Sequence, residues 1–239
     1  MILAGGKGTR FKEYTKQIPK PMIKVLDKPL FIHIIDIYKQ YGIKNVYILG
    51  GYKQEVFEDF LKKNYQKSNN EENAYIYQNM SIKLLDTGLE SMTGTRILIG
   101  MNEVKEDNFY VTYGDGLCDV DINKLTEFHF SNNSTVTITA VNTPERFGRL
   151  EINDKKVINF GEKINTRKEW INGGFFVVNK DVKKYLYLDD CIFEKNPMEK
   201  LAQDGNLYAF KHDGFWQCVD TIRELEILES KLLDFEQEI

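Results

Sequence analysis

The sequence predicts an α/β fold with a Rossmann-like, mixed but mainly parallel sheet flanked by helices, and a smaller β-rich portion. Two observations support this. Apolar runs typical of strands alternate with helical patterns through the first 140 residues, and shorter β-rich segments follow. The chain has 239 residues, 42% of them apolar and 28% charged, which is enough to bury a large core. Ligands of such sheets bind at the carboxyl ends of the strands.

The elements of the first part follow from hydrophobic periodicity. Continuous apolar runs predict buried strands, and amphipathic spacing predicts helices, the first of them stopped by Gly42. A polar, Asn-rich stretch at 63–74 predicts a surface loop. The expected strands are 1–4, 45–51, 74–78 and 108–115, and the expected helices are 30–42, 54–63 and 94–104.

The second part begins after a strand at 134–141. Short β segments follow, "GRLEI", "KVINF" and "WINGGFFVVN", and helices return at 195–204 and 221–236. We expect a single domain over 1–239 in which residues 141–239 form a half folded onto residues 1–140.

Composition excludes several classes of protein. A formal net charge of −4 gives no basic surface for nucleic acid, and the absence of a long apolar run argues against a membrane span. The cysteines are odd in number and far apart, and the histidines lack ligand spacing, so we expect neither a disulfide framework nor a zinc site. A reducing, cytoplasmic location fits best. These residues are Cys118, Cys191, Cys218, His33, His129 and His212.

The opening "MILAGGKGTR" places a glycine-rich loop directly after the first strand. Gly5, Gly6 and Gly8 allow the backbone to approach a ligand, and their N–H groups can converge on phosphate. The spacing matches neither GxGxxG nor a P-loop. An ordinary turn is the alternative.

Ten residues further on, "PKPM" restricts the backbone on both sides of Lys20. Together, Arg10 and Lys20 would neutralise a triphosphate and stabilise the charge that develops on a phosphoryl group. A solvated loop lysine is the alternative.

"LAGGKGTR" followed by "PKPM" resembles the signature of the sugar-1-phosphate nucleotidyltransferases. Further motifs are similar, in order and spacing, to the glucose-1-phosphate cytidylyltransferase branch, and "SMTG" at 91–94 separates it from branches with a segment closer to "PLGTAG". These motifs are "DTGLESMTGTR" (86–96), "TYGDG" (112–116), "RFGRLEI" (146–152), "INGGFFV" (171–177) and "GFWQCVDT" (214–221).

The resemblance implies an in-line attack by a sugar 1-phosphate on the α-phosphorus of CTP, which gives a CDP-sugar and pyrophosphate and requires Mg²⁺. Glucose 1-phosphate is the first expected acceptor, and surface-polysaccharide sugar synthesis is the expected pathway. A homo-oligomer is expected. Residues 1–140 would bind the nucleotide and residues 141–239 the sugar phosphate.

By the same resemblance, Arg10, Lys20, Asp115 and Asp220 are the catalytic residues. Asp115 and Asp220 each end a strand-like run and would hold the Mg²⁺, a hard ion that prefers oxygen ligands. An N-cap of the following helix is the alternative for Asp220.

The resemblance also assigns the nucleotide side. Arg96 would bind phosphates at a helix N-terminus, with a surface arginine as the alternative, and Thr93 and Gly94 would lie near the base. The full expected set is Leu3, Ala4, Gly5, Gly6, Gly8, Thr9, Arg10, Lys20, Thr93, Gly94, Arg96 and Gly114.

On the sugar side, Lys163 would pair with the sugar phosphate, and Glu162 and Asn172 would bind hydroxyl groups. Gly173 would let the sugar approach the backbone. The aromatic residues Tyr113 and Trp216 would form walls of this pocket, with core packing as the alternative.

Other functions stay open at this point. The enzyme could use another nucleoside triphosphate or another sugar or polyol phosphate, because only "SIK" separates "YIYQNM" from "LLDTG", where the branch carries a longer insertion. A nucleotide-sugar-dependent glycosyltransferase that uses the Asp119/Asp121 triplet is a second reading. A non-catalytic nucleotide-binding homologue is a third.

Overall fold

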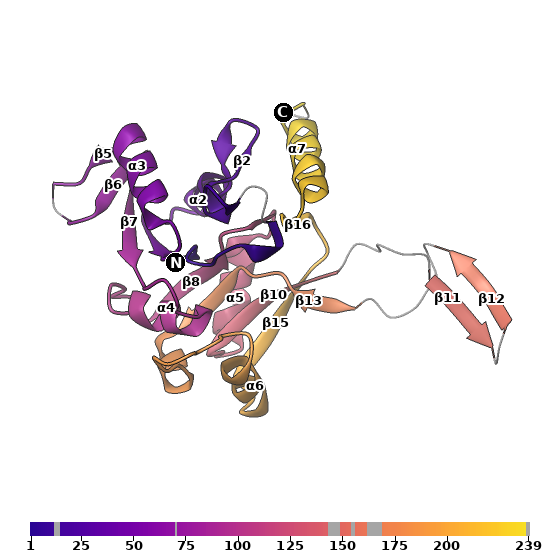
Figure 1. The fold of residues 1–239 in the computed structure, drawn as a ribbon. Helices are drawn as coiled ribbons and strands as arrows, with labels where there is room; N and C mark the ends of the chain where they lie inside the picture. The colour runs from indigo at the N-terminus through magenta and orange to yellow at the C-terminus, as the bar shows by residue number, and fades with distance from the viewer. Residues whose placement is uncertain (12–14, 70, 143–148, 154–155, 162–168, 238–239) are drawn as a thin grey trace.

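The computed structural model describes residues 1–11, 15–69, 71–142, 149–153, 156–161 and 169–237. A ten-stranded sheet forms its centre (Figure 1). Four parallel strands lie side by side in the order β7 (Met80–Asp86), β4 (Asn45–Gly50), β1 (Ile2–Leu3) and β8 (Asn108–Tyr113). Their common direction brings several carboxyl ends to one edge, where the candidate site lies.

Antiparallel strands extend the sheet on both sides. Beyond β7 lie β6 (Ala74–Tyr77) and β5 (Gln66–Lys67), and beyond β8 lies β14 (Phe176–Asn179). The strand β10 (Val136–Asn142) is antiparallel to both β14 and β13 (Trp170–Asn172), and β15 (Leu207–His212) runs parallel to it on its other side. The expected mixed, mainly parallel α/β sheet is confirmed.

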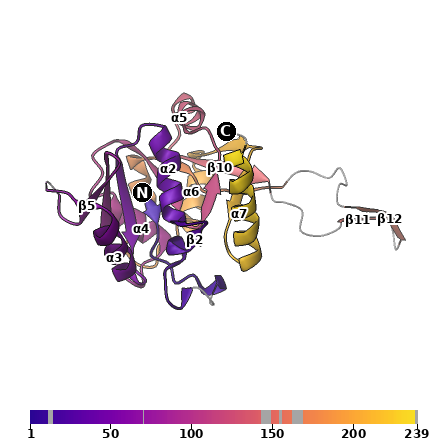
Figure 2. The same ribbon diagram turned by 90° about the horizontal axis from the view of Figure 1, so that it is seen from above.

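Helices cover both faces of the sheet (Figures 1 and 2). The alternating strand pattern separates two apolar cores: Ile2 points to one and Leu3 to the other. The first core receives side chains of α2 (Leu30–Gln40), α3 (Gln54–Asn64), α5 (Ile122–Ser131) and α7 (Ile222–Gln237). The second receives side chains of α4 (Thr93–Gly100) and α6 (Asn196–Gln203).

Several elements differ from those expected. The polar stretch 63–74 includes the short strand β5, and α4 ends at Gly100 rather than continuing to 104. The strand β7 was not expected. It follows β6 through a tight turn in which Gln78 (φ 45°) and Asn79 (φ 71°) both take the left-handed conformation typical of two-residue hairpins.

The helix α5 and the strand β15 were also not expected. Asp121 begins α5 because its Oδ1 accepts a hydrogen bond from the Lys124 N–H at 3.1 Å. The strand β15 has only intermediate and exposed residues, and its apolar run is confined to the four residues Leu207, Tyr208, Ala209 and Phe210. Its pairing with β10, rather than its local pattern, makes it a strand.

Three small ladders complete the described part. The strands β9 (Gly116–Cys118) and β16 (Trp216–Cys218) pair next to the candidate site, and β2 (Lys24–Val25) pairs with β3 (Lys28–Pro29). The hairpin of β11 (Arg149–Asn153) and β12 (Lys156–Gly161) lies apart from the main sheet in Figures 1 and 2. None of the described helices is long and apolar enough to cross a membrane.

Candidate active site

A cavity of about 350 Å³ opens where β1 and β8 end. Eleven of the twelve residues expected on the nucleotide side are described with their side chains, and ten of them line this cavity. Gly94 is absent from the lining, and its N–H donates to the carbonyl of Cys191 at 2.8 Å. The lining residues are Leu3, Ala4, Gly5, Gly6, Gly8, Thr9, Lys20, Pro21, Ser91, Met92, Thr93, Arg96, Tyr113, Gly114, Asp115 and Asp220.

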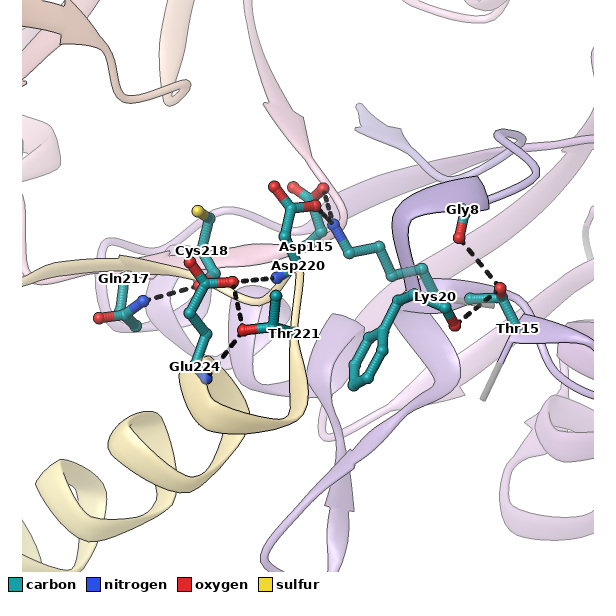
Figure 3. Close-up of polar contacts among 10 residues, drawn as sticks. Gly8, Thr15, Lys20, Asp115, Gln217, Cys218, Asp220, Thr221 and Glu224 are labelled. Atoms are coloured by element: carbon teal, nitrogen blue, oxygen red, sulfur yellow. Dashed lines mark hydrogen bonds and ion pairs between the residues drawn. The ribbon is translucent and has the colours of Figure 1, made fainter. Parts of the chain in front are cut away.

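Contacts with neighbouring residues fix the conformation of the glycine-rich loop. Gly8 has φ +59°, and a Cβ there would lie 2.8 Å from Thr15 Cγ2. The hydroxyl of Thr15 lies 3.0 Å from both the Gly8 and Phe11 carbonyls (Figure 3). The loop therefore holds its backbone against the cavity, as a phosphate-binding loop requires. The strand β1 ends just before it.

Arg96 has a structural role in the protein. Its residue surface is only 3% exposed, and its Nη1 and Nη2 donate to five oxygens of the protein, so it is not a surface arginine. These acceptors are the carbonyls of Gly5, Gly50, Gly88 and Leu89 and the Thr87 hydroxyl, at 2.6 to 3.3 Å. Arg96 also lines the cavity, and its contact with phosphate stays a prediction.

This arginine fastens the start of the glycine loop to neighbouring segments. A Cβ on Gly5 would lie 2.1 Å from Arg96 Nη1, so only glycine permits the approach. Burial lowers the pKa of Arg96, and the carboxylates of Asp86 and Glu90 oppose this shift. The guanidinium stays charged, because its ordinary pKa is so high.

Lys20 joins the two aspartates that were expected to hold the metal. Its Nζ lies 2.7 Å from Asp115 Oδ2 and 2.6 Å from Asp220 Oδ1 (Figure 3). The short helix η2 (Lys20–Met22), which begins after Pro19, buries the lysine so that 7% of it is exposed. Burial alone would lower the pKa of Lys20, but the two carboxylates outweigh it and raise the pKa.

Asp220 does not cap the following helix. Thr221 does so instead: its hydroxyl accepts from the Glu224 N–H at 3.3 Å and donates to Glu224 Oε2 at 3.1 Å. Glu224 Oε2 also accepts from the Asp220 N–H at 2.8 Å (Figure 3). The backbone of Asp220 is thus fixed by α7 while its carboxylate faces Lys20.

A second cavity of about 380 Å³ adjoins the first and shares Thr93, Tyr113, Asp115 and Asp220 with it. Its lining includes four residues that were expected on the sugar side. These are Tyr113, Asn172, Gly173 and Trp216. The two aspartates therefore stand where the two cavities meet.

Hydrogen bonds order the wall of the second cavity. Trp216 Nε1 donates to the Gly173 carbonyl at 2.8 Å, and Asn172 Nδ2 donates to the Tyr113 hydroxyl at 2.9 Å. Asn172 Oδ1 accepts from the Gly174 N–H at 2.8 Å. Burial raises the pKa of Tyr113, as does Glu194, so the phenol stays protonated.

Glu194 was missed by sequence analysis. It lines the second cavity, and its two oxygens accept from the Tyr113 hydroxyl at 2.7 Å and the Thr93 hydroxyl at 2.6 Å. No motif marks this glutamate, because its partners lie 81 and 101 residues away in the chain. It links the ends of β8 and the start of α4 across both cavities.

Three expected residues cannot be placed. Glu162 and Lys163 lie outside the described residues, and Arg10 is described only as part of the short helix η1 (Thr9–Phe11), without its side chain. The acids of the alternative triplet have other contacts. Asp119 pairs with His212 at 2.7 Å, and Asp121 caps α5.

The family model of the nucleotidyl transferases matches residues 1–234. The chain is 39% identical over 241 residues to a glucose-1-phosphate cytidylyltransferase of Salmonella typhimurium, covering 96% of this chain and 93% of that protein. It is 35% identical to a probable glucose-1-phosphate cytidylyltransferase of Bacillus subtilis, covering 94% of this chain and 92% of that protein.

Solved structures share the fold. HddC from Yersinia pseudotuberculosis, in a complex with GMP-PN, superposes with a TM-score of 0.72 at 24% identity, over 97% of each chain. A UDP-glucose pyrophosphorylase in a complex with UDP-glucose superposes with a TM-score of 0.71 at 17% identity, over 98% of this chain and 97% of that one.

Proposed function

The chain belongs to the nucleotidyl transferase family, and from this premise we propose that it joins CTP to a sugar 1-phosphate, giving a CDP-sugar and pyrophosphate. Glucose 1-phosphate is the proposed acceptor, after the names of the two bacterial relatives. The product would supply nucleotide sugar for polysaccharide synthesis. A homo-oligomer in the cytoplasm is part of the same proposal.

One observation carries the proposal: two cavities meet at a pair of carboxylates that one buried lysine bridges. A transfer between two polyanions needs two adjacent pockets and positive charge at their junction. The glycine loop lines the first cavity and would cradle the triphosphate. The polar wall of Asn172 and Trp216 lines the second and suits sugar hydroxyls.

The two cavities do not follow the two halves of the chain strictly. Asp220 from the second half reaches the proposed nucleotide cavity, and Thr93 and Tyr113 from the first half line the proposed sugar cavity. We therefore propose one domain over 1–239 in which each half contributes mainly, but not solely, to one substrate.

The residues at the junction fit Mg²⁺. Asp115 and Asp220 offer only oxygen donors, and they already accommodate one cation, the Lys20 ammonium, between them. When bound, the ion would polarise phosphate oxygens and offset the charge on the reacting groups. A phosphate of the incoming nucleotide would offer the Lys20 ammonium a further anion to pair with.

Lys20 would then bind the substrates. The raised pKa of Lys20 keeps its side chain protonated at neutral pH. The ammonium would pair with phosphate oxygens and orient the α-phosphorus towards the attacking oxygen. Thr93 and Gly94 are the proposed neighbours of the base. Lys163 is the proposed contact of the phosphate group of the sugar phosphate, and Glu162 is the proposed contact of its hydroxyl groups.

A matrix of nucleoside triphosphates against sugar phosphates, read by pyrophosphate release, tests this function. We expect release with CTP and glucose 1-phosphate, dependent on Mg²⁺, and far less with ATP, GTP or UTP. Release with a different pair would reassign base or acceptor within the family. Absence of release with every pair would refute catalysis.

The glycosyltransferase alternative is not favoured. Asp119 and Asp121 are engaged by His212 and by the start of α5, and neither residue lines the two cavities. The family match over residues 1–234 points the same way.

A further inference from the structure

A second group of potential metal ligands lies at one end of the β9–β16 ladder, and the proposed catalytic aspartates lie at the other end. In this ladder Gly116 pairs with Cys218 at the end next to Asp115, and Cys118 pairs with Trp216 at the other end. Beyond that end lie Asp119 and His212. Each of Cys118, Asp119 and His212 offers one ligand atom, and these atoms all lie within 4.8 Å of one another.

The local contacts show how the three side chains are held. His212 Nε2 lies 2.7 Å from Asp119 Oδ1 and 3.3 Å from the Phe215 carbonyl oxygen. The Asp119 N–H donates to that same carbonyl at 3.1 Å. One ring nitrogen therefore faces two oxygen acceptors, and the thiol of Cys118 lies beside them. Cys118 is buried, whereas the Asp119 side chain is 50% exposed, so the group opens to solvent on one side.

Gly214 makes room for this arrangement. A Cβ at that position would lie 2.5 Å from Asp119 Oδ1 and 2.6 Å from His212 Cε1. With any other residue at this position, the carboxylate or the imidazole would have to shift.

A thiol, an imidazole and a carboxylate form a mixed sulfur, nitrogen and oxygen donor set that suits a borderline transition metal and not Mg²⁺. We propose that Cys118, Asp119 and His212 bind an ion such as Zn²⁺, with one coordination position open to solvent. Among the described residues, no other group of three His, Cys, Asp or Glu side chains meets this geometry.

Such an ion would stabilise the β9–β16 ladder, which carries Asp115 and Asp220 at its other end. Asp115 directly precedes β9, Asp220 follows β16 by two residues, and the Val219 N–H donates to the Asp115 carbonyl at 2.9 Å. An ion bound at the far end of the same ladder would hold β9 against the segment 212–216.

Titration with Co²⁺ in excess Mg²⁺ tests the site without an activity assay. We expect one equivalent of Co²⁺ to produce the near-ultraviolet absorption of a cobalt–thiolate bond and visible bands of low coordination number, and Zn²⁺ to abolish both by competition. Cys118→Ser should remove the charge-transfer absorption. Asp119→Asn and His212→Asn should weaken Co²⁺ binding at least about tenfold, because even indirect partners of metal ligands have effects of this size.

Two matched variants serve as controls. Cys191→Ser removes another buried thiol, and Asp213→Asn removes a neighbouring carboxylate that accepts from Asn142 at 2.9 Å. Both should bind Co²⁺ like the unaltered protein. Zn²⁺ should raise the Tm of the unaltered protein and of both controls, and not that of Asp119→Asn.

Asp119 is exposed, so its variant should fold even if Cys118→Ser does not. A spectrum without thiolate absorption, or one that Cys118→Ser and Asp119→Asn leave unchanged, would overturn the site and assign the group to a simple His212–Asp119 ion pair. Either result would leave the proposed transferase function untouched, because pyrophosphate release is not measured here.

Discussion

At the scale of single residues, the centre of the site is a charge arrangement rather than a motif. Lys20 is nearly buried, and its ammonium is stabilised by two carboxylates that come from positions 95 and 200 residues further along the chain. A buried charge without such partners would be costly. The three groups therefore depend on one another, and a cation or a phosphate that enters the site must rearrange them.

Lys20→Met is expected to lower kcat/KM at least about 100-fold, because it removes the cation that we propose acts on the transferred phosphoryl group. The same variant should bind Mn²⁺ more tightly in the absence of nucleotide, because the ammonium no longer competes for Asp115 and Asp220. Calorimetry with Mn²⁺ and pyrophosphate release measure the two effects. Lys24→Met, at an exposed lysine nearby, is the control and should change neither. Unaltered turnover of Lys20→Met would remove this residue from the mechanism.

Trp216→Phe keeps the aromatic wall but loses the hydrogen bond from Nε1 to the Gly173 carbonyl. A bond of this kind contributes about 1 kcal/mol to the stability of the cavity wall, so its loss should raise the KM for the sugar phosphate by up to roughly fivefold. The KM for CTP should stay the same, because Trp216 lines only the second cavity. Trp170→Phe, at the other tryptophan, is the matched control. An equal rise in both KM values would contradict the assignment of the second cavity to the sugar.

At the scale of elements, turns and caps orient the proposed catalytic groups. The helix α7 begins with Thr221 and Glu224, which fix the Asp220 backbone through the 2.8 Å contact to Glu224. On the other side, Arg96 from α4 fixes the glycine loop. Both supports come from helices on the edge of the site, so helix stability and catalytic geometry are linked.

Thr221→Ala removes the cap of α7 and is expected to lower the free energy of unfolding by about 1 kcal/mol. It should also reduce kcat, because Asp220 loses part of its support. Thr221→Ser keeps the capping hydroxyl and should restore both values. Urea unfolding and steady-state assays make the measurement. A stable variant with an unchanged kcat would show that the cap does not position Asp220.

Arg96→Met should cost at least about 3 kcal/mol of stability, because several carbonyl oxygens lose a charged donor in a buried site. Arg96→Lys should recover only part of this loss, since an ammonium cannot reach acceptors on five residues with a planar fork. The KM for CTP should rise in both variants as the glycine loop loosens. If Arg96 acted only on phosphates, stability would stay near that of the unaltered protein.

At the scale of the whole molecule, the mixed sheet decides where chemistry is possible. The parallel strands β1 and β8 end together. The strand β14 is antiparallel to β8, so Asn172 and Gly173, which precede β14, lie near the end of β8. The two apolar cores lie on opposite faces of this sheet and keep its edge in place.

Stability of the whole molecule should fall in mild acid through His129. This side chain is 1% exposed, and burial lowers its pKa to about 4, against about 6.5 in the unfolded chain. Above pH 6.5 both states are neutral. Between pH 6.5 and 4 only the unfolded state takes up the proton, so the folded state loses up to about 3 kcal/mol relative to it.

Urea unfolding at pH 7.5 and pH 5 measures the effect, with His129→Gln as the comparison. The variant is less stable at pH 7.5, because it loses the contacts of His129 with Thr137 and Asn108, but it should lose less stability on acidification. Equal losses in the two proteins would show that His129 takes up its proton in the folded state as well.

Sequence patterns predicted three of the four adjacent parallel strands, β1, β4 and β8, together with most of the helices and the glycine loop, because those features depend on periodicity and on local backbone preference. They did not predict that Arg96 donates to four backbone carbonyls, that Glu194 accepts from two hydroxyl groups or that Thr221 caps α7. Charge alone does not reveal whether backbone carbonyls surround a guanidinium.

By itself, the sequence determined the fold class, through its alternating apolar patterns, and the family, through a run of motifs along the chain. The site at the strand ends is a prediction of the same motifs. Only the tertiary structure decided which groups meet: Lys20 with both aspartates, Glu194 with two hydroxyl groups, and Cys118 with Asp119 and His212. The physical reason is that hydrogen bonds and ion pairs act over a few ångströms. The packing of the helices and strands, which brings together residues up to 200 positions apart in the chain, sets those distances.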